Sequence, residues 1–325
     1  MPITTPPRVL RVGSRDSKLA LIQTELVVAA LQKAHPSLEI EIQTMKTIGD
    51  KIQDVALSKF GDKGLFTKEL ETALAAGLID LVVHSLKDMP TTLPPNMALA
   101  AVTEREDARD ALIMAPRHTH TSLDALPPGS VVGTGSVRRV AQLRRLYPHL
   151  RFMDIRGNLN TRLAKLDADD SPFDALILAV AGMARLGMHH RITQPIDNVL
   201  HAVGQGALGI EIRADDDLTR VIAQGLDHRP SRLACAAERE LMRVLEGGCS
   251  VPIGAVAHWD EPTKRLSLKA IVASPDGAQA VEASSSSQIA TDGDEDAQAR
   301  ALGAQVAAMM RERGAAQILA GIERA

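Results

Sequence analysis

The first 250 residues of the chain repeat one pattern: a short apolar segment, a turn rich in Gly, Ser or Asp, and then an amphipathic helix. The segment "VLRVG" at 9–13 leads through "SRDS" into a predicted helix over 18–34. A second predicted helix, over 66–77, precedes the apolar segment 79–85. Because helices that alternate with apolar strands pack on the faces of one sheet, the pattern predicts an α/β fold with largely parallel sheets.

The pattern restarts near Asp107 and is replaced by another after Cys249. Residues beyond Cys249 show two alternating segments, a Ser-rich edge at 284–287 and one closing helix at about 295–312, which is typical of an α+β domain. We therefore expect two α/β domains like the lobes of periplasmic binding proteins, followed by a smaller α+β C-terminal domain. The expected boundaries are 1–105 with 202–226 for the first domain, 106–201 for the second and 227–325 for the third.

Charge and cysteine content restrict the classes of function. The 325 residues include 37 Lys and Arg against 40 Asp and Glu, a net charge of -3, so no overall positive field indicates nucleic acid or an anionic membrane. Only two cysteines occur, and the start "MPITTPPRVL" shows no secretory leader. These features predict a soluble cytoplasmic protein without a Cys235–Cys249 disulfide.

Arginines recur at the predicted turns from strand to helix. Such turns offer backbone N–H groups, small hydroxyls and the positive end of a helix beside a guanidinium, which together bind carboxylates or phosphates. Since the planar arginine fork matches a carboxylate, several such turns predict a ligand with several carboxylates. The turns are Gly13–Ser17 with Arg15, 133–139 with Ser136, Arg138 and Arg139, and 156–162 with Arg156 and Arg162. Arg144 and Arg145 are expected to be solvated helix charges.

The segment "VVHSLKDMP" at 82–90 combines an apolar strand with charged residues at its carboxyl end, where open α/β sheets bind ligands. Asp88 there could transfer a proton or stabilise a developing cation. Alternatively, Lys87 and Asp88 form an exposed turn pair before Pro90. The residues alone leave both interpretations open.

Three other features need interpretation. Residues 204–209 match G-x-G-x-x-G, but a strand-like segment follows, so we expect a tight turn at a domain crossing. Cys235 is expected to pack in a core, whereas Cys249 follows two glycines and could be a nucleophile, an attachment point or an inert turn residue. The histidines show no ligand spacing, and no metal site is expected.

Several segments together resemble the hydroxymethylbilane synthase family, also called porphobilinogen deaminases. The resemblance covers nearly the whole chain in order, in the segments "RVGSRDSKLAL", "GDKGLFTKELE", "VHSLKDMP", "EREDARDAL", "GTGSVRR", "RGNLNTRL", "AVAGMARLG", "AVGQGALGIE" and "LEGGCSVPIGA".

The resemblance implies a transferase of tetrapyrrole (haem) biosynthesis. Such an enzyme joins four porphobilinogen molecules head to tail with loss of ammonia and then releases linear hydroxymethylbilane by hydrolysis. It implies a dipyrromethane cofactor held by a thioether to Cys249, a catalytic Asp88 and a monomeric protein. The residues implied to bind cofactor or substrate are Arg15, Ser17, Lys87, Ser136, Arg138, Arg139, Arg156, Arg162 and Arg185, and those implied for a lid are Lys59, Lys63 and Phe66.

Two positions depart from the family pattern. Gly135 stands where the family commonly has a serine, and Ile48 stands where many members have an arginine. The main alternative function is a non-catalytic, two-lobed carboxylate-binding protein, which would bind its ligand reversibly and would not need Cys249. A second alternative is a nucleotide-dependent enzyme that uses the glycines at 204–209.

Overall fold

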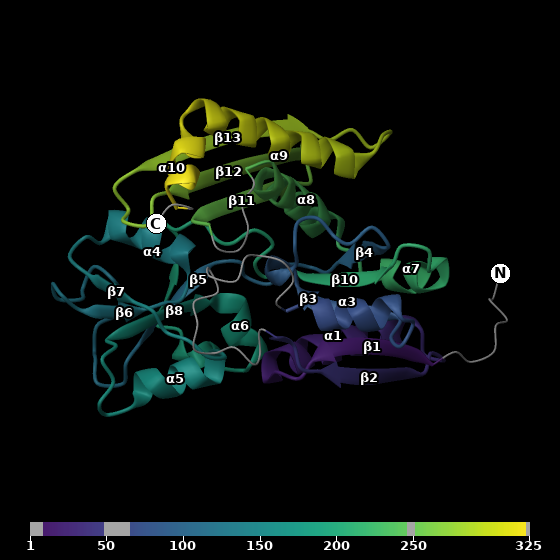
Figure 1. The fold of residues 1–325 in the computed structure, drawn as a ribbon, viewed down its shortest axis with the longest axis horizontal. Coiled ribbons are helices and arrows are strands. Elements are labelled where there is room, and N and C mark those ends of the chain that lie inside the picture. The colour runs from purple at the N-terminus through teal and green to yellow at the C-terminus, as the bar shows by residue number, and fades with distance from the viewer. Residues whose placement is uncertain (1–8, 49–65, 246–250, 323–325) are drawn as a thin grey trace.

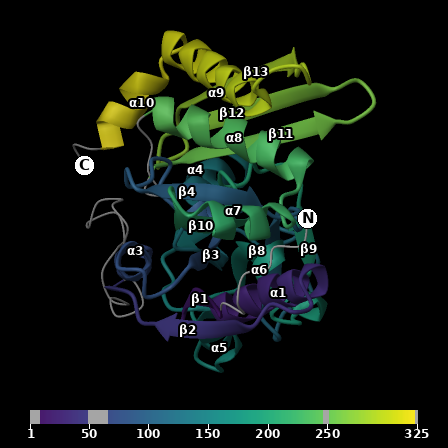
Figure 2. The same cartoon turned by 90° about the vertical axis from the view of Figure 1, so that its right-hand side faces the viewer.

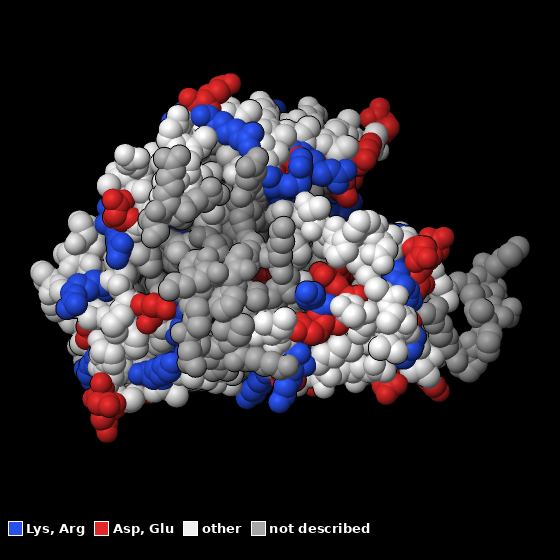
Figure 3. Space-filling model, in the orientation of Figure 1, with Lys and Arg blue, Asp and Glu red and all other residues white. Residues whose placement is uncertain are grey.

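The computed structural model describes residues 9–48, 66–245 and 251–322. Lys59 and Lys63 of the expected lid lie outside these residues, as does Cys249. In the described part of the chain, no helix is both long enough and apolar enough to cross a membrane. Lys and Arg side chains are interspersed with Asp and Glu over the face of the molecule that Figure 3 shows.

The first sheet has five strands and contains the N-terminus of the described chain. Its order is β2 (Ile40–Met45), β1 (Leu10–Arg15), β3 (Leu81–Ser85), β10 (Leu208–Arg213) and β4 (Met97–Val102). Strand β1 is parallel to β2 and β3, whereas β10 is antiparallel to both of its neighbours. The helices that accompany this sheet are α1 (Lys18–Ala34), α3 (Lys68–Ala75) and α7 (Asp217–Gln224) (Figure 1).

The second sheet repeats this arrangement. Its order is β7 (Arg151–Met153), β6 (Val131–Gly133), β8 (Ala175–Ala179), β5 (Asp110–Met114) and β9 (Gln194–Ile196), with helices α4 (Val137–Leu146), α5 (Leu159–Asp167) and α6 (Val180–Arg185). Strand β5 is antiparallel to β8 and β9, and β6 is parallel to β7 and β8. Four strands of each described sheet therefore share one direction, but two of the four strand pairings in each sheet are antiparallel, so the sheets are mixed and not largely parallel as expected. The exceptions, β5 and β10, are the strands that the chain enters when it crosses from one sheet to the other.

The third unit is smaller and has the expected α+β composition. Strands β11 (Ile253–Asp260), β12 (Arg265–Ala273) and β13 (Ala280–Gln288) form an antiparallel meander in which the Ser-rich β13 is an edge strand. Helices α8 (Arg229–Val244) and α9 (Glu295–Glu312) pack against each other and against this sheet, and α10 (Ala315–Ile322) follows. Figures 1 and 2 both show this unit above the two five-stranded sheets.

The two connections between the five-stranded sheets lie side by side. The backbone N–H of Glu106, in the segment after β4, donates to the carbonyl of Gly206, in the segment before β10, at 3.2 Å. The fully buried carboxylate of Glu238 on α8 accepts from Arg105 in the first connection and from the N–H of Gly204 in the second. A buried carboxylate is stable only when paired, so this one group ties the third unit to both connections.

Candidate active site

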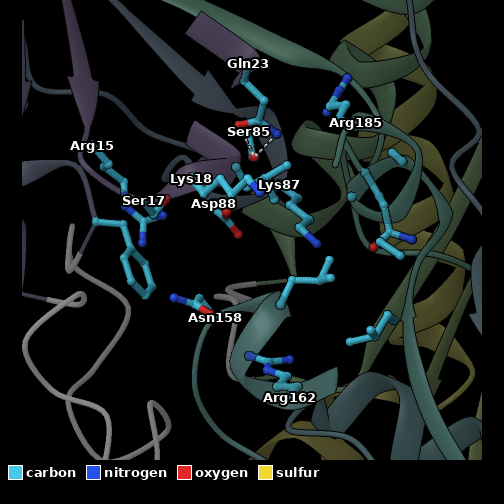
Figure 4. Close-up of a pocket in the computed structure, with 18 of the residues that line it drawn as sticks. Arg15, Ser17, Lys18, Gln23, Ser85, Lys87, Asp88, Asn158, Arg162 and Arg185 are labelled. Atoms are coloured by element: carbon cyan, nitrogen blue, oxygen red, sulfur yellow. Dashed lines mark hydrogen bonds between the residues drawn. The ribbon is translucent and has the colours of Figure 1, made fainter. Parts of the chain in front are cut away.

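A cavity of about 670 Å³ lies between the first and second sheets. Among the described residues, eight basic side chains and two carboxylates line it, so this lining is positively charged although the net charge of the chain is -3. The basic residues are Arg15, Lys18, Lys46, Lys87, Arg139, Arg156, Arg162 and Arg185, and the carboxylates are Asp16 and Asp88. Figure 4 shows Lys87 and Asp88 directed into a space that Asn158 and Arg162 border from the opposite side.

The turn from β1 to α1 supplies one edge of the cavity. Ser17 caps α1, because its side chain accepts a hydrogen bond from the N–H of Ala20, and the first turn of the helix contains no acidic residue. The positive end of α1 is therefore available to an anion. The guanidinium of Arg15 lies over the ring of Phe66, 4.3 Å from its centroid, which places Phe66 in the cavity wall by a cation–π contact.

The end of β3 supplies Lys87 and Asp88. The strand is buried, and its last turn is fixed by Leu86, which is 1% exposed and donates its N–H to the carbonyl of Ala207 at 3.0 Å. Lys87 and Asp88 then line the cavity and are only partly exposed, unlike an exposed turn pair. Burial lowers the pKa of the Lys87 ammonium, and the negative charge of Asp88 opposes part of this effect. His84 points elsewhere, into a buried pair with Glu211 at 2.8 Å.

The first turn of α4 contains Ser136, Arg138 and Arg139. Ser136 caps the helix, and both arginines bind the buried carboxylate of Asp110 at the start of β5, with shortest contacts of 2.8 Å. Burial alone would raise the pKa of Asp110, but the two guanidiniums hold it well below its usual range. Arg139 also lines the cavity, whereas Ser136 and Arg138 are not among its lining residues. Arg138 instead donates to the carbonyl of Leu200 at 2.7 Å.

The other three predicted arginines line the cavity, and each is fixed by a hydrogen bond within the chain. Arg156 Nε donates to Asp154 at 2.7 Å, Arg162 Nε to the carbonyl of Gly157 at 2.8 Å, and Arg185 Nη2 to the carbonyl of Gly206 at 2.6 Å. A guanidinium has five N–H donors, so these bonds hold the side chain without exhausting its capacity. Burial lowers the pKa of Arg162 to about 10, and the positive charge of Arg139 adds to this effect. Burial also lowers the pKa of Arg185.

Several lining residues were not assigned from the sequence, including Lys18, Lys46 and Gln23. Gln23 is 4% exposed, and its side-chain amide exchanges two hydrogen bonds with the hydroxyl of Ser85, at 3.0 and 3.1 Å. Its position on the buried face of α1, between Ala20 and Val27, was a signal that could have identified it. Lys46 follows directly after β2, and Lys18 is the first residue of α1.

The backbone at 204–209 and the side chain of Cys235 have the conformation and burial expected from the sequence, although Gly206 also lines the cavity. Residues 203–206 form a turn, the strand β10 begins at Leu208 instead of a helix, and Gly206 has φ +91°. A Cβ at Gly206 would lie 2.3 Å from the carbonyl oxygen of Glu106, so this close approach requires glycine. Cys235 is buried in the core, where Arg105 Nη2 lies 2.8 Å from its sulfur, and burial raises the pKa of its thiol to about 11.

Comparison with known proteins decides the family. Residues 10–221 match the model described as porphobilinogen deaminase, dipyrromethane cofactor binding domain, and residues 232–312 match the model of the C-terminal domain of the same family. The chain belongs to the porphobilinogen deaminase family.

Curated relatives extend this similarity over nearly the full length. The porphobilinogen deaminase of Synechococcus elongatus is 51% identical over 319 residues, which cover 98% of this chain and 96% of the relative. That of Gloeobacter violaceus is 53% identical over 315 residues, covering 96% of this chain and 93% of the relative. Among solved structures, the methionine-binding protein MetQ is 15% identical, covers 68% of this chain and 91% of its own, and has a TM-score of 0.42.

The family match and the cavity coincide. The dipyrromethane cofactor binding domain at 10–221 contains both five-stranded sheets, and all of the described residues that line the cavity fall within it. The third unit, with β11 to β13, corresponds to the C-terminal domain of the porphobilinogen deaminase family.

Proposed function

We propose that this chain is a hydroxymethylbilane synthase. It joins four porphobilinogen molecules head to tail, releases one ammonia at each addition, and then releases linear hydroxymethylbilane by hydrolysis. One observation supports this function above all: eight cationic side chains of the described residues line the same cavity as Asp88, within the cofactor binding domain of the family.

The ligand chemistry fits this cavity. Each porphobilinogen carries an acetate and a propionate arm, so every unit added to the chain brings two more carboxylates. Burial lowers the pKa values of Arg162 and Arg185, and an anionic ligand would relieve this unfavourable burial of charge. Arginine also offers a planar fork that matches each carboxylate.

The same residues fit the dipyrromethane cofactor, whose two pyrrole rings carry such arms. When bound, the cofactor supplies the covalently held primer to which the first substrate unit is joined. We propose that it is attached through a thioether to Cys249. The residues that would hold its carboxylates, or those of the growing chain, are Arg15, Ser17, Lys87, Arg139, Arg156, Arg162 and Arg185. Ser136, which caps α4, and Arg138, which shares Asp110 with Arg139, are not among the lining residues.

Asp88 is the proposed catalytic residue. It is one of two carboxylates that line the cavity, and it projects from the end of a buried strand among cations. In this position its carboxylate stabilises the positive charge that develops on the substrate ring as the amino group leaves. Lys87 and Arg139 bind carboxylate arms of the ligand next to it and so orient the ring toward Asp88.

The domain organisation belongs to the same proposal. The boundaries 1–105 with 202–226, 106–201 and 227–325 assign one sheet to each domain and put the cavity between the first two. Domain interfaces provide room for a lengthening ligand. We further propose that Phe66 belongs to a lid with Lys59 and Lys63 and that the enzyme is monomeric, as the family resemblance implies. We also propose that it is cytoplasmic, as its low cysteine content indicates.

The stoichiometry of the reaction tests this function. Purified protein should consume porphobilinogen continuously, with one ammonia released per molecule consumed and one linear tetrapyrrole formed per four. A two-lobed carboxylate-binding protein would instead bind porphobilinogen reversibly at a fixed ratio and release no ammonia. That result would refute the enzymatic function.

A further inference from the structure

We propose that Asp154 is a positioning residue for Arg156, and that the missing side chain at Gly135 provides the space in which Asp154 does this. The inference rests on the proposed function, in which Arg156 binds a carboxylate of the cofactor or of the growing chain. It assigns a role to a carboxylate that does not line the cavity.

Asp154 and Arg156 lie in the turn between β7 and α5. The Arg156 Nε–H donates to Asp154 Oδ2 at 2.7 Å, and the guanidinium lines the cavity with its side chain 24% exposed. A guanidinium held through Nε keeps both terminal nitrogens at its far edge. Those two nitrogens can bind the two oxygens of a carboxylate side by side. Asp154 therefore orients the arginine without occupying the edge that a ligand would use.

Gly135 lies directly against this pair. A Cβ at position 135 would be 3.1 Å from Asp154 Oδ1 and 3.2 Å from the carbonyl oxygen of Ile155, both closer than an ordinary van der Waals contact. The glycine is not required by its backbone, because Gly135 is not among the described glycines with positive φ. The absence of a side chain at Gly135 leaves space for the carboxylate of Asp154. A side chain there would displace the Asp154 carboxylate, which can rotate about its side-chain bonds, before it displaced the backbone of Ile155.

Two opposing effects of Asp154 make the proposal testable. Its negative charge by itself repels an anionic ligand, so removing it would tighten binding. Its hydrogen bond holds the guanidinium in a binding orientation, so removing it would weaken binding. Asp154 is 54% exposed, and an exposed charge is strongly screened by solvent. We therefore infer that orientation outweighs repulsion.

The first experiment compares Asp154→Ala and Asp154→Asn with wild type. The readouts are KM for porphobilinogen, kcat, cofactor occupancy by intact-protein mass, and the thermal unfolding midpoint. Asp154→Ala should raise KM about tenfold if Arg156 holds the growing chain, the factor for about 1.4 kcal/mol, or lower cofactor occupancy if Arg156 holds the cofactor. Asp154→Asn should have a smaller effect, because the amide oxygen still accepts from Nε. An unchanged or lower KM at full occupancy in Asp154→Ala would overturn the proposal.

Asp167→Asn is the matched control. Asp167 also pairs with an arginine of the second unit, Arg191, at 2.7 and 2.9 Å, but neither residue lines the cavity. Its KM and occupancy should equal those of wild type. An equal loss in this control would show that the effect of Asp154 is not specific to Arg156.

A double-mutant cycle tests the role of Gly135. Gly135→Ala should impair binding in wild type but add little in the Asp154→Ala background, because the displaced group is already absent. Fully additive effects would contradict the role of Gly135.

Arg156→Gln distinguishes an error in the proposed function of Arg156 from an error in the positioning role of Asp154. If it behaves as wild type, the proposed function of Arg156 is wrong; if it is impaired while Asp154→Ala is not, only the positioning role is wrong.

Discussion

The guanidinium of Arg105 binds the carboxylate of Glu238 through two nitrogens, at 2.9 and 2.8 Å. Arg105 belongs to one connection between the five-stranded sheets, and Glu238 belongs to the helix that leads toward Cys249. The same carboxylate accepts from the N–H groups of Gly204 and Ala257, at 2.8 and 3.0 Å. Both connections between the five-stranded sheets and the third unit therefore meet at one buried charge.

Replacing Glu238 should destabilise the protein. Glu238→Gln leaves the Arg105 charge buried without its partner, a loss of about 3–5 kcal/mol in the free energy of unfolding. Denaturant titration measures this loss. The control is Glu240→Gln on the same helix, whose partner Arg243 is half exposed, and whose replacement should change the free energy by less than about 1 kcal/mol. Equal losses of unfolding free energy in Glu238→Gln and Glu240→Gln would contradict a stabilising role for the buried pair of Glu238 and Arg105.

The effect of Glu238→Gln should depend on pH. Burial alone would raise the pKa of Glu238, but Arg105 and its hydrogen bonds lower it below the ordinary value of 4.5. A carboxyl whose pKa is lower in the folded state stabilises the fold above the unfolded pKa, and this stabilisation is lost as the pH falls through the folded pKa. The difference in unfolding free energy between wild type and Glu238→Gln should therefore shrink as the pH is lowered below 4.5. A difference that stays constant down to about pH 3 would count against this assignment.

Asp88→Asn should retain the fold and lose turnover. The amide has nearly the same shape but cannot stabilise a developing cation as a carboxylate does, so kcat should fall by a factor of about 100 or more. The matched control is Asp16→Asn, which changes the other carboxylate that lines the cavity. Steady-state kinetics and the thermal unfolding midpoint test both variants. If Asp16→Asn abolished turnover and Asp88→Asn did not, the catalytic assignment would be wrong.

Arg138 and Arg139 should differ although they are neighbours and share Asp110. Lysine cannot reproduce the bidentate contact of Arg138 with Asp110, so Arg138→Lys should lower the unfolding midpoint and leave KM within about twofold of wild type. Arg139→Lys should raise KM about tenfold, since Arg139 lines the cavity. Parallel measurement of unfolding and KM separates the two effects. A similar increase in KM in both variants would contradict the placement of Arg138 outside the cavity.

The bounds of a helix could be predicted from the sequence where residues that favour its start and its end are both present. Helix α1 has the predicted bounds because Ser17 caps its start and Pro36 lies just beyond its end, and α9 also matches its predicted range. Strand β4 was missed because its sequence, MALAAV, shows no alternation of apolar and polar residues. In the segment 175–184, strand β8 ends at Ala179 and helix α6 begins at Val180 without an intervening break in the sequence pattern. Its residues are apolar throughout, so periodicity could not distinguish the two states.

From the sequence, only the parts of the site that lie within a single turn could be predicted. A turn between strand and helix brings Arg15 and Ser17 together within five residues, so the sequence shows their proximity directly. The pairing of Arg138 with Asp110 joins residues 28 positions apart, and the contact of Gln23 with Ser85 joins residues 62 apart. Such partners depend on how the sheets and helices pack. No local pattern therefore shows that Arg138 binds within the protein whereas Arg139 faces the cavity.

The central claim is that the chain carries a primer on Cys249, and the mass of the intact protein tests it most directly. Protein expressed in cells that make porphobilinogen should be heavier than its sequence by two linked pyrrole units. Peptide mapping should place this mass on the peptide that contains Cys249, and Cys249→Ala should lack it. An unmodified wild-type mass, or the same adduct on Cys235, the other cysteine of the chain, would contradict the account.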